Sequence, residues 1–226
     1  MPPTLPESLT SSRALRFPEN QNIGRVYVRP YADTITRFSA DLLDWQYLAE
    51  AKGLVIVSAG MEVQLRLNQS VARDLSLLNL LSPHSLEVIV LEDIPLAETE
   101  LVHLAELTGL HTLSLANTSV RDEALSNVQK LGNLKHLFVG DTEISDLGLT
   151  YLHGLRQLQL LDLGGTKITG SGLKYLRELP HLKYLHLSLT SLTSSGFVEL
   201  SQLPCLRVLW LIGAGLSDDN LAHLQT

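Results

Sequence analysis

The stretch LQLLDLGGTKITGSGLKYLRELPH, residues 158–181, carries aliphatic side chains at spacings that fit neither one helix nor one strand. Around residues 161–163 apolar and polar side chains alternate, as in a short strand with one buried face. Leu173, Leu176 and Leu179 then recur at every third residue, which is typical of a short helix that lays one stripe on a core. The stretch therefore predicts one unit of strand, turn, helix and turn.

The same pattern returns every 24 residues along most of the chain. A seventh, degenerate copy is in register over residues 62–85, and the last copy is shortened. The other copies begin at Leu86, Leu110, Leu134, Leu158, Leu182 and Leu206. One copy alone cannot hide its apolar faces, so the copies must stack into a shared core.

Small and polar residues also recur at fixed places in the unit. One set is suited to capping the first turn of each helix: Ser145, Thr169, Thr193 and Ser217. A second set favours close approach of the adjacent coil: Gly148, Gly172 and Gly196. A third set carries hydroxyls that can bond to backbone in the turn: Thr118, Thr142, Thr166 and Thr190.

The segment TEISDLGLTYLHGLRQLQLLDL, residues 142–163, resembles the signature TxIxDxGLxxLxxLxxLxxLxL of bacterial-type and cysteine-containing-type leucine-rich repeats. The resemblance implies an α/β solenoid with a parallel sheet on the concave side and short helices on the convex side. It implies a fold and not a function, because leucine-rich repeats serve many unrelated partners.

Charge, cysteine content and hydropathy limit the classes of partner and the cellular compartment that we expect for this protein. The formal net charge of the 226 residues is −7 and lysine and arginine form no run, so we expect neither DNA nor RNA as a partner. The single cysteine, Cys205, cannot form an internal disulfide, which favours a reducing compartment. No export signal and no apolar stretch of about 18 residues is visible, so we expect a cytoplasmic protein without a membrane partner.

The first third of the chain does not follow the repeat. We expect a flexible tail over residues 1–21, a β-rich N-terminal cap over 22–61, and the repeat domain over 62–226. GRVYV from Gly24 and LVIV from Leu54 predict strands, and SAGM after the latter suits a hairpin turn into EVQLRL. DLLDWQYLAEAKG predicts either a short helix or a long loop. A ligand-binding role of the cap module stays open.

The third and fifth positions of each repeat are expected to project from the concave sheet. In the later repeats these positions are rich in aromatic and imidazole groups, the composition typical of the centre of an interaction surface. The leading hypothesis is therefore a non-catalytic module that binds a protein partner of unknown identity. The residues predicted to bind it are His136, Phe138, Leu160, Asp162, Tyr184, His186 and Trp210.

Other functions are weighed beside this one. Asp162, His186 and the nearby Ser188 suggest a hydrolase, and His136 with the first two suggests a metal-dependent enzyme. No phosphate-loop, zinc-protease or nucleophile-elbow motif appears, so we expect no catalytic residue, cofactor or metal. A third hypothesis, a substrate-recognition arm of a larger assembly, is implied by eukaryotic relatives of these repeats. A fourth treats the concave patch as ordinary surface without a partner.

The last copy ends without a polar closing segment, which leaves its core open. Self-association through this end, a covering partner or further chain would each shield the exposed leucines.

Overall fold

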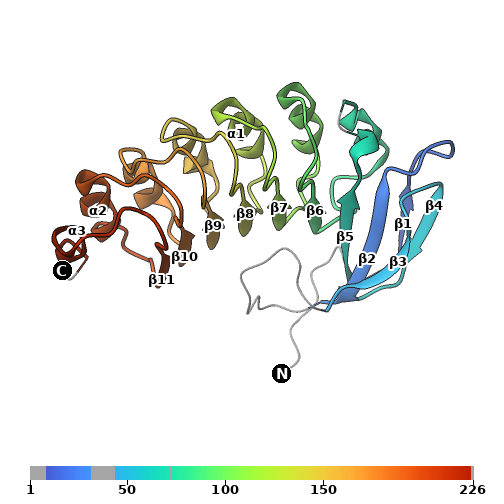
Figure 1. Ribbon diagram of the computed structural model, residues 1–226. Helices are drawn as coiled ribbons and strands as arrows, with labels where there is room; N and C mark the ends of the chain where they lie inside the picture. Colours follow the sequence, from blue (N-terminus) through green and yellow to red (C-terminus); the bar gives the residue numbers. More distant parts are fainter. Residues whose placement is uncertain (1–8, 32–43, 72, 225–226) are drawn as a thin grey trace.

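The computed structural model describes residues 9–31, 44–71 and 73–224, which form a curved solenoid with a sheet inside the arc and helical segments outside it (Figure 1). The nine-stranded sheet has the order β11-β10-β9-β8-β7-β6-β5-β2-β3, and it is parallel from β5 to β11. Its strands are β2 (Gly24–Pro30), β3 (Gln46–Glu50), β5 (Met61–Leu67), β6 (Val88–Val90), β7 (Thr112–Ser114), β8 (His136–Phe138), β9 (Leu160–Asp162), β10 (Tyr184–His186) and β11 (Val208–Trp210). This architecture confirms the leucine-rich-repeat solenoid expected from the sequence.

Most helical segments on the convex side are 3-10 helices rather than α-helices. A 3-10 helix has three residues per turn, so leucines at every third position fall on one face. Leu173 and Leu176 accordingly point into the core from one such segment. The 3-10 segments are η2 (Gln69–Val71), η3 (Leu75–Leu80), η4 (Glu98–Leu104), η5 (Asp122–Ala124), η6 (Gly148–Gly154) and η7 (Leu173–Glu178). The α-helices are α1 (Leu125–Val128), α2 (Ser194–Ser201) and α3 (Asp218–Ala222).

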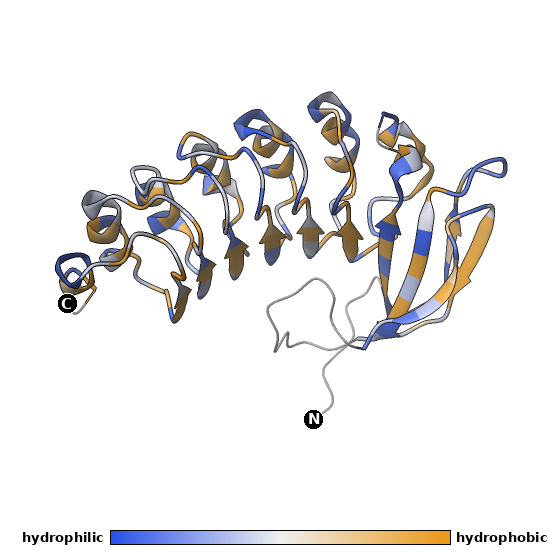
Figure 2. Cartoon of the chain, in the orientation of Figure 1, coloured by the Kyte–Doolittle hydropathy of each residue, from blue (hydrophilic) through white to orange (hydrophobic). Residues whose placement is uncertain are grey.

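The core is built from rows of aliphatic side chains that run across the strands. Each strand pairs with the equivalent residues of the next copy, so Leu137, Leu161 and Leu185 stack in register and are fully buried. Leu209 continues the row in β11 but is only half-buried, because β11 is the edge strand of the sheet formed by the described residues. Hydrophobic residues recur in the strands and on the facing sides of the helical segments (Figure 2).

The recurring threonines bind the turn that follows each strand. Thr118 Oγ1 donates to the Leu115 carbonyl at 2.6 Å, and Thr142 Oγ1 donates to the Val139 carbonyl at 2.7 Å. Two further threonines repeat this bond three residues back: Thr166 and Thr190. These hydroxyls are buried, so each bond satisfies a polar group that would otherwise be costly to bury.

The predicted helix caps form at two of the four positions. Thr193 and Ser217 accept hydrogen bonds from backbone amides in the first turns of α2 and α3. Ser145 accepts the Leu147 amide at 3.3 Å, one residue before η6, while its hydroxyl donates to Asp122 at 2.6 Å. The prediction is wrong for Thr169, whose hydroxyl donates to Asp146 at 2.6 Å. The carboxylate of the preceding coil takes the place of the cap there, because stacked coils bring it within reach.

The N-terminal module extends the sheet with antiparallel strands. β2 lies between β3 and β5, and β5 continues the parallel array with Leu65 opposite Ile89. Arg13 ties this module to the first coils through two bonds to the Glu87 carboxylate, at 2.6 and 3.1 Å. Both side chains are buried, which makes this contact a clamp and not a surface ion pair.

Three expectations for this region need correction. Residues 9–21 are not a loose tail, because β1 (Arg13–Arg16) pairs antiparallel with β4 (Leu54–Val57) in a second sheet and buries Leu15. β4 and β5 are not a hairpin, because they belong to different sheets. Residues 46–50 form neither the helix nor the loop that we expected, because they pair with β2 as strand β3. Residues 1–8 and the start of the expected helix lie outside the described residues.

Replacing Gly172 by alanine is expected to destabilise the fold by about 1–3 kcal/mol, the usual cost of overpacking. A Cβ atom at Gly172 would lie 2.4 Å from the backbone carbonyl oxygen of Asp146 in the preceding coil, which cannot move aside alone. Urea denaturation followed by circular dichroism measures the loss. Gly132→Ala is the matched control, because its Cβ would meet nothing within 4 Å. Equal midpoints for the two variants would contradict close coil packing at Gly172.

Candidate functional site

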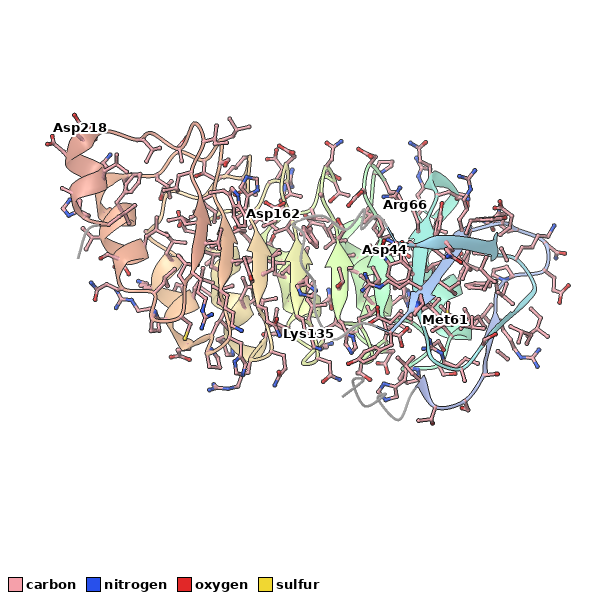
Figure 3. All side chains as sticks on the ribbon, turned by 90° about the horizontal axis from the view of Figure 1, so that it is seen from below. Asp44, Met61, Arg66, Lys135, Asp162 and Asp218 are labelled. Atoms are coloured by element: carbon pink, nitrogen blue, oxygen red, sulfur yellow. The ribbon has the colours of Figure 1, made fainter. Side chains whose placement is uncertain are left out.

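The concave face is formed by the first and third residues of each short strand. In-register pairing places these residues in two rows that cross the sheet: Tyr184 lies beside Leu160 and Val208, and His186 lies beside Asp162 and Trp210. Figure 3 views this face from below, with Asp162 toward one edge of the sheet and Lys135 toward the other. The seven predicted residues therefore share one face, as the alternation of side chains along a strand requires.

The second row contains a polar and aromatic series. His186 Nδ1 lies 2.6 Å from Asp162 Oδ1, a hydrogen bond between neighbouring strands. The His186 and Trp210 rings meet edge to face, with centroids 6.2 Å apart and planes at 84°. Both Asp162 and His186 keep part of their side chains in solvent, at 17% and 27% exposed. The rings and the carboxylate are thus fixed in place while still accessible.

Burial varies along both rows, of which the first contains His136 and Leu160 and the second contains Phe138. His136, Phe138 and Leu160 are buried, with 6%, 6% and 4% of their surfaces exposed. Phe138 and Leu160 form a cluster on the concave face with Val88 and Val90, and the partly buried Trp45 and Tyr184 pack against it. Trp45 comes from the segment before β3, so a residue of the N-terminal module covers part of this concave-face cluster. Sequence reasoning missed this contact, since Trp45 lies outside the repeat.

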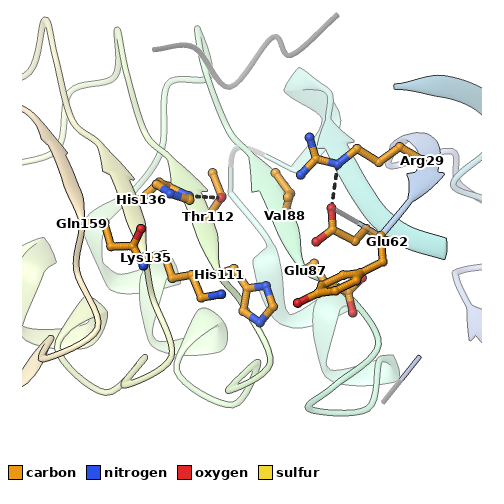
Figure 4. A pocket seen from close by; sticks show the side chains of 10 residues that line it. Arg29, Glu62, Glu87, Val88, His111, Thr112, Lys135, His136 and Gln159 are labelled. Carbon is orange, nitrogen blue, oxygen red and sulfur yellow. Dashed lines mark hydrogen bonds and ion pairs between the residues drawn. The ribbon is translucent and has the colours of Figure 1, made fainter. Parts of the chain in front are cut away.

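The guanidinium group of Arg29 also lies over the Trp45 ring. The guanidinium carbon of Arg29 lies 4.5 Å from the centroid of the Trp45 ring. Arg29 Nε in turn donates to Glu62 Oε2 at 2.6 Å (Figure 4). The N-terminal part of the concave face is therefore occupied by side chains of the β2–β3 region, whereas Asp162, Tyr184, His186 and Trp210 are half-buried at the other end.

The cavity in Figure 4 lies between β2 and the first coils. Its volume is about 30 Å³, enough for one or two water molecules but too small for an organic ligand. Polar side chains surround it, and Thr112 Oγ1 lies 3.0 Å from His136 Nδ1. The remaining lining residues include Tyr31, Glu87, His111, Lys135 and Gln159.

Burial changes the titration of this cluster. Burial, aided by the charge of Lys135, lowers the pKa of His136 to about 3 and that of His111 to about 4. Burial raises the pKa of Glu62 and of Glu87, against the opposing effect of their arginine partners. Both histidines are therefore neutral in the folded protein at pH 7.

A second, larger cavity lies at the carboxyl ends of the later strands. Its volume is about 250 Å³. Loop residues following four successive strands line it together with Asp162 and His186: Gly140, Asp141, Gly164, Gly165, Ser188, Leu189 and Ile212. Sequence reasoning identified the two strand residues and Ser188 but missed the other loop residues, although the glycines at 140, 164 and 165 were a visible signal.

The enzymatic alternatives find limited support in this geometry. Ser188 Oγ accepts a hydrogen bond from the Ile212 amide at 3.1 Å, and Asp162 and His186 are the hydrogen-bonded pair. His136 lies in β8 and His186 in β10, with β9 between them. Within the described residues no group of three or more histidine, cysteine, aspartate or glutamate side chains is arranged to hold a metal ion.

The helices of the described ranges are all too short to cross a bilayer.

Comparison with known proteins agrees with the fold. A family model described as Leucine Rich repeat matches residues 155–176 and 178–201. No curated protein matches the sequence.

Three solved structures are similar over part of their length. TLR13 in its complex with ssRNA13 has a TM-score of 0.52 and 25% identity, covering 66% of this chain and 21% of that one. A leucine-rich-repeat protein of Leptospira interrogans has a TM-score of 0.54 and 20% identity, covering 72% and 40%. Internalin InlF of Listeria monocytogenes has a TM-score of 0.49 and 23% identity, covering 66% and 47%. The chain spans less than half of the length of each.

Replacing His136 by asparagine is expected to reduce the loss of stability in acid. Below about pH 6.5 the unfolded chain protonates this histidine, whereas the folded chain does so only near pH 3. Stability is thus lost as pH falls through this window, at about 1.4 kcal/mol per pH unit. The raised pKa values of Glu62 and Glu87 make stability increase as pH falls, which opposes the effect of His136. Both glutamates are present in the parent and in the variant, so the difference between the two proteins reports the contribution of His136.

Urea midpoints at pH 7 and pH 5 measure the effect. The variant should lose about 2 kcal/mol less than the parent between these values. His153→Asn, at an exposed histidine of η6, is the control and should behave as the parent. The same pH-dependent loss in the parent and in both variants would refute the neutral, buried state of His136.

Proposed function

The chain is a leucine-rich-repeat solenoid, and we propose that the C-terminal half of its concave sheet binds a protein partner. We call this half the concave patch and define it by Asp162, Tyr184, His186 and Trp210. The observation that carries the proposal is the edge-to-face pair of His186 and Trp210 on a half-exposed sheet surface.

Rigid aromatic groups with partial exposure are the side chains that contribute most to protein interfaces. Trp210 and Tyr184 stand on strands of a continuous sheet, so they lose little conformational freedom when a partner binds. The hydrogen bond between Asp162 and His186 holds the polar part of the patch in the same way. These features favour a preformed binding surface.

The buried members of the predicted site are not part of this patch. His136, Phe138 and Leu160 expose too little surface to contact a partner directly. We propose that Phe138 and Leu160 support the patch from one side, because Tyr184 packs against the cluster to which they belong.

A protein partner is favoured over a nucleic acid. The TLR13 structure contains an RNA, but the charge of this chain is −7 and both Asp162 and Asp141 lie in or beside the patch. Phosphate backbones are bound chiefly by lysine and arginine, and the patch contains neither. We therefore propose a protein ligand, with RNA as an outcome that the experiment can reveal.

The combined substitution Trp210→Ala and Tyr184→Ala is expected to weaken capture of the partner by tenfold or more, in keeping with aromatic interface residues that each contribute about 1 kcal/mol or more. The full chain is immobilised, partners are purified from the native organism and identified by mass spectrometry, and the affinity of the purified partner is then measured. Ribonuclease treatment of the extract distinguishes a protein that binds directly from one bridged by RNA.

Tyr175→Ala is the matched control, because Tyr175 is an exposed aromatic on the convex segment η7. The thermal transitions of all variants should remain close to that of the parent, since these side chains are not in the main core. Unchanged affinity in the double variant, or an equal loss in Tyr175→Ala, would rule out the concave patch.

A further inference from the structure

We propose that the pocket at the carboxyl ends of β8, β9, β10 and β11 receives an arginine side chain of the protein partner. This inference rests on the proposed function, because the pocket adjoins the concave patch and shares Asp162 and His186 with it. The pocket volume, about 250 Å³, is below the range of about 300–1,000 Å³ that holds a whole small-molecule ligand. It suits one long side chain of a larger partner.

The floor of the pocket is an oriented carboxylate. Asp162 Oδ1 accepts hydrogen bonds from His186 Nδ1 at 2.6 Å and from the Gly164 amide at 3.0 Å. Among the described residues no hydrogen bond uses Oδ2, so this oxygen can receive a donor from outside. The carboxylate is therefore held in one orientation before a partner arrives.

Glycines keep the space beside this carboxylate open. A Cβ atom at Gly140 would lie 3.3 Å from both oxygens of Asp162. A Cβ atom at Gly164 would lie 2.7 Å from Cε1 of His186. Any other residue type at these positions would press on the polar floor or displace the imidazole. The two glycines thus create the room that a guanidinium would occupy.

The pocket attracts cations rather than anions. Its lining contains two carboxylates, Asp141 and Asp162, and no lysine or arginine. The amides of Asp141, Gly165 and Leu189 already donate to carbonyls of the following coil, at 2.7 to 2.8 Å. Lys135 lies toward the opposite edge of the sheet (Figure 3). An anion would therefore meet like charge and occupied donors, whereas a cation would meet acceptors.

The rim selects arginine from the cations. Leu189 and Ile212 are 69% and 74% exposed at the mouth of the pocket, and an aliphatic stem can lie along them. The planar guanidinium can donate two parallel hydrogen bonds to a carboxylate, which the compact ammonium of lysine cannot do. Because arginine is also enriched at interface hot spots, it fits both the rim and the floor.

Backbone strain at Leu189 points to the same rim. The equivalent residue of each coil has a positive φ, which glycine adopts freely and asparagine or aspartate tolerate. Those residues are Asp93, Asn117, Asp141, Gly165 and Gly213, whereas Leu189 has φ 59°. A leucine in this conformation is strained and exposed, so its apolar side chain contributes nothing evident to folding. We attribute its presence to contact with the partner.

The test uses the full chain labelled with nitrogen-15 and the peptide acetyl-Gly-Arg-Gly-amide as the probe. Titration should shift the amide signals of Gly164, Gly165 and Ile212 with one common, millimolar dissociation constant. The matched peptide with citrulline keeps the shape but lacks the charge, and should bind at least about tenfold more weakly, as expected for loss of a charge-assisted hydrogen bond. Equal binding of both peptides, or no localised shift, would overturn the inference.

Variants assign the effect to the pocket. Asp162→Asn should weaken binding of the arginine peptide about tenfold, and Asp141→Asn, at an exposed position, gives a second measurement that does not disturb the Asp162–His186 pair. Asp219→Asn, on the exposed side of α3, is the control with the same change of charge. Full binding by both pocket variants would overturn the inference.

Leu189→Gly separates binding from stability. Relief of the positive φ should raise the urea midpoint, while loss of the rim should weaken binding of the arginine peptide several-fold.

Partner capture that depends on Trp210 but shows no arginine preference would overturn this inference alone. Capture independent of Trp210 would overturn the proposed function instead.

Discussion

Parallel pairing at a fixed offset of 24 residues is the constraint on which the rest of this structure depends. Three-residue strands cannot hold themselves in place, so each is fixed by the strands beside it and by the leucine rows beneath them. The same offset brings Gly172 against the Asp146 carbonyl and the Thr169 hydroxyl against the Asp146 carboxylate. The close packing of coils therefore requires glycine at position 172, and it brings the Asp146 carboxylate within hydrogen-bond distance of Thr169.

This register also determines what the concave face contains. Side chains of one position in the repeat become neighbours on one face, so Asp162, His186 and Trp210 form a continuous row although they are separated in sequence. The row is not equally accessible along its length. Trp45, positioned by β3 and covered by Arg29, packs on the early strands, and the half-exposed groups are confined to the later ones. The N-terminal module thereby limits the available surface.

The 24-residue repeat allowed the solenoid to be predicted from the sequence. It also allowed the buried leucine rows and the two rows on the concave face to be predicted. The burial of Phe138 and Leu160 was not predictable from the repeat alone, because the cluster to which they belong also packs against Trp45, which belongs to no repeat. Strand β1 was also hidden, since four residues form a strand only when a distant partner, here β4, is in place. The larger pocket depends on loops whose backbone conformation no side-chain pattern reveals, although paired glycines at 164 and 165 marked the position.

The buried ion pair between Arg13 and Glu87 makes the two ends of the solenoid differ in how their coils are held together. It spans more than 70 residues of sequence and is buried at both ends, and Glu87 also accepts the Val63 amide. Peeling the first coil from the array requires two desolvated charges to separate, which costs several kcal/mol. Between β10 and β11 the coils are connected by backbone ladder bonds, half-buried leucines, the edge-to-face rings of His186 and Trp210 and the bond from the Ile212 amide to Ser188 Oγ. The contacts that join β11 to the array are therefore less buried than the clamp at the N-terminal end.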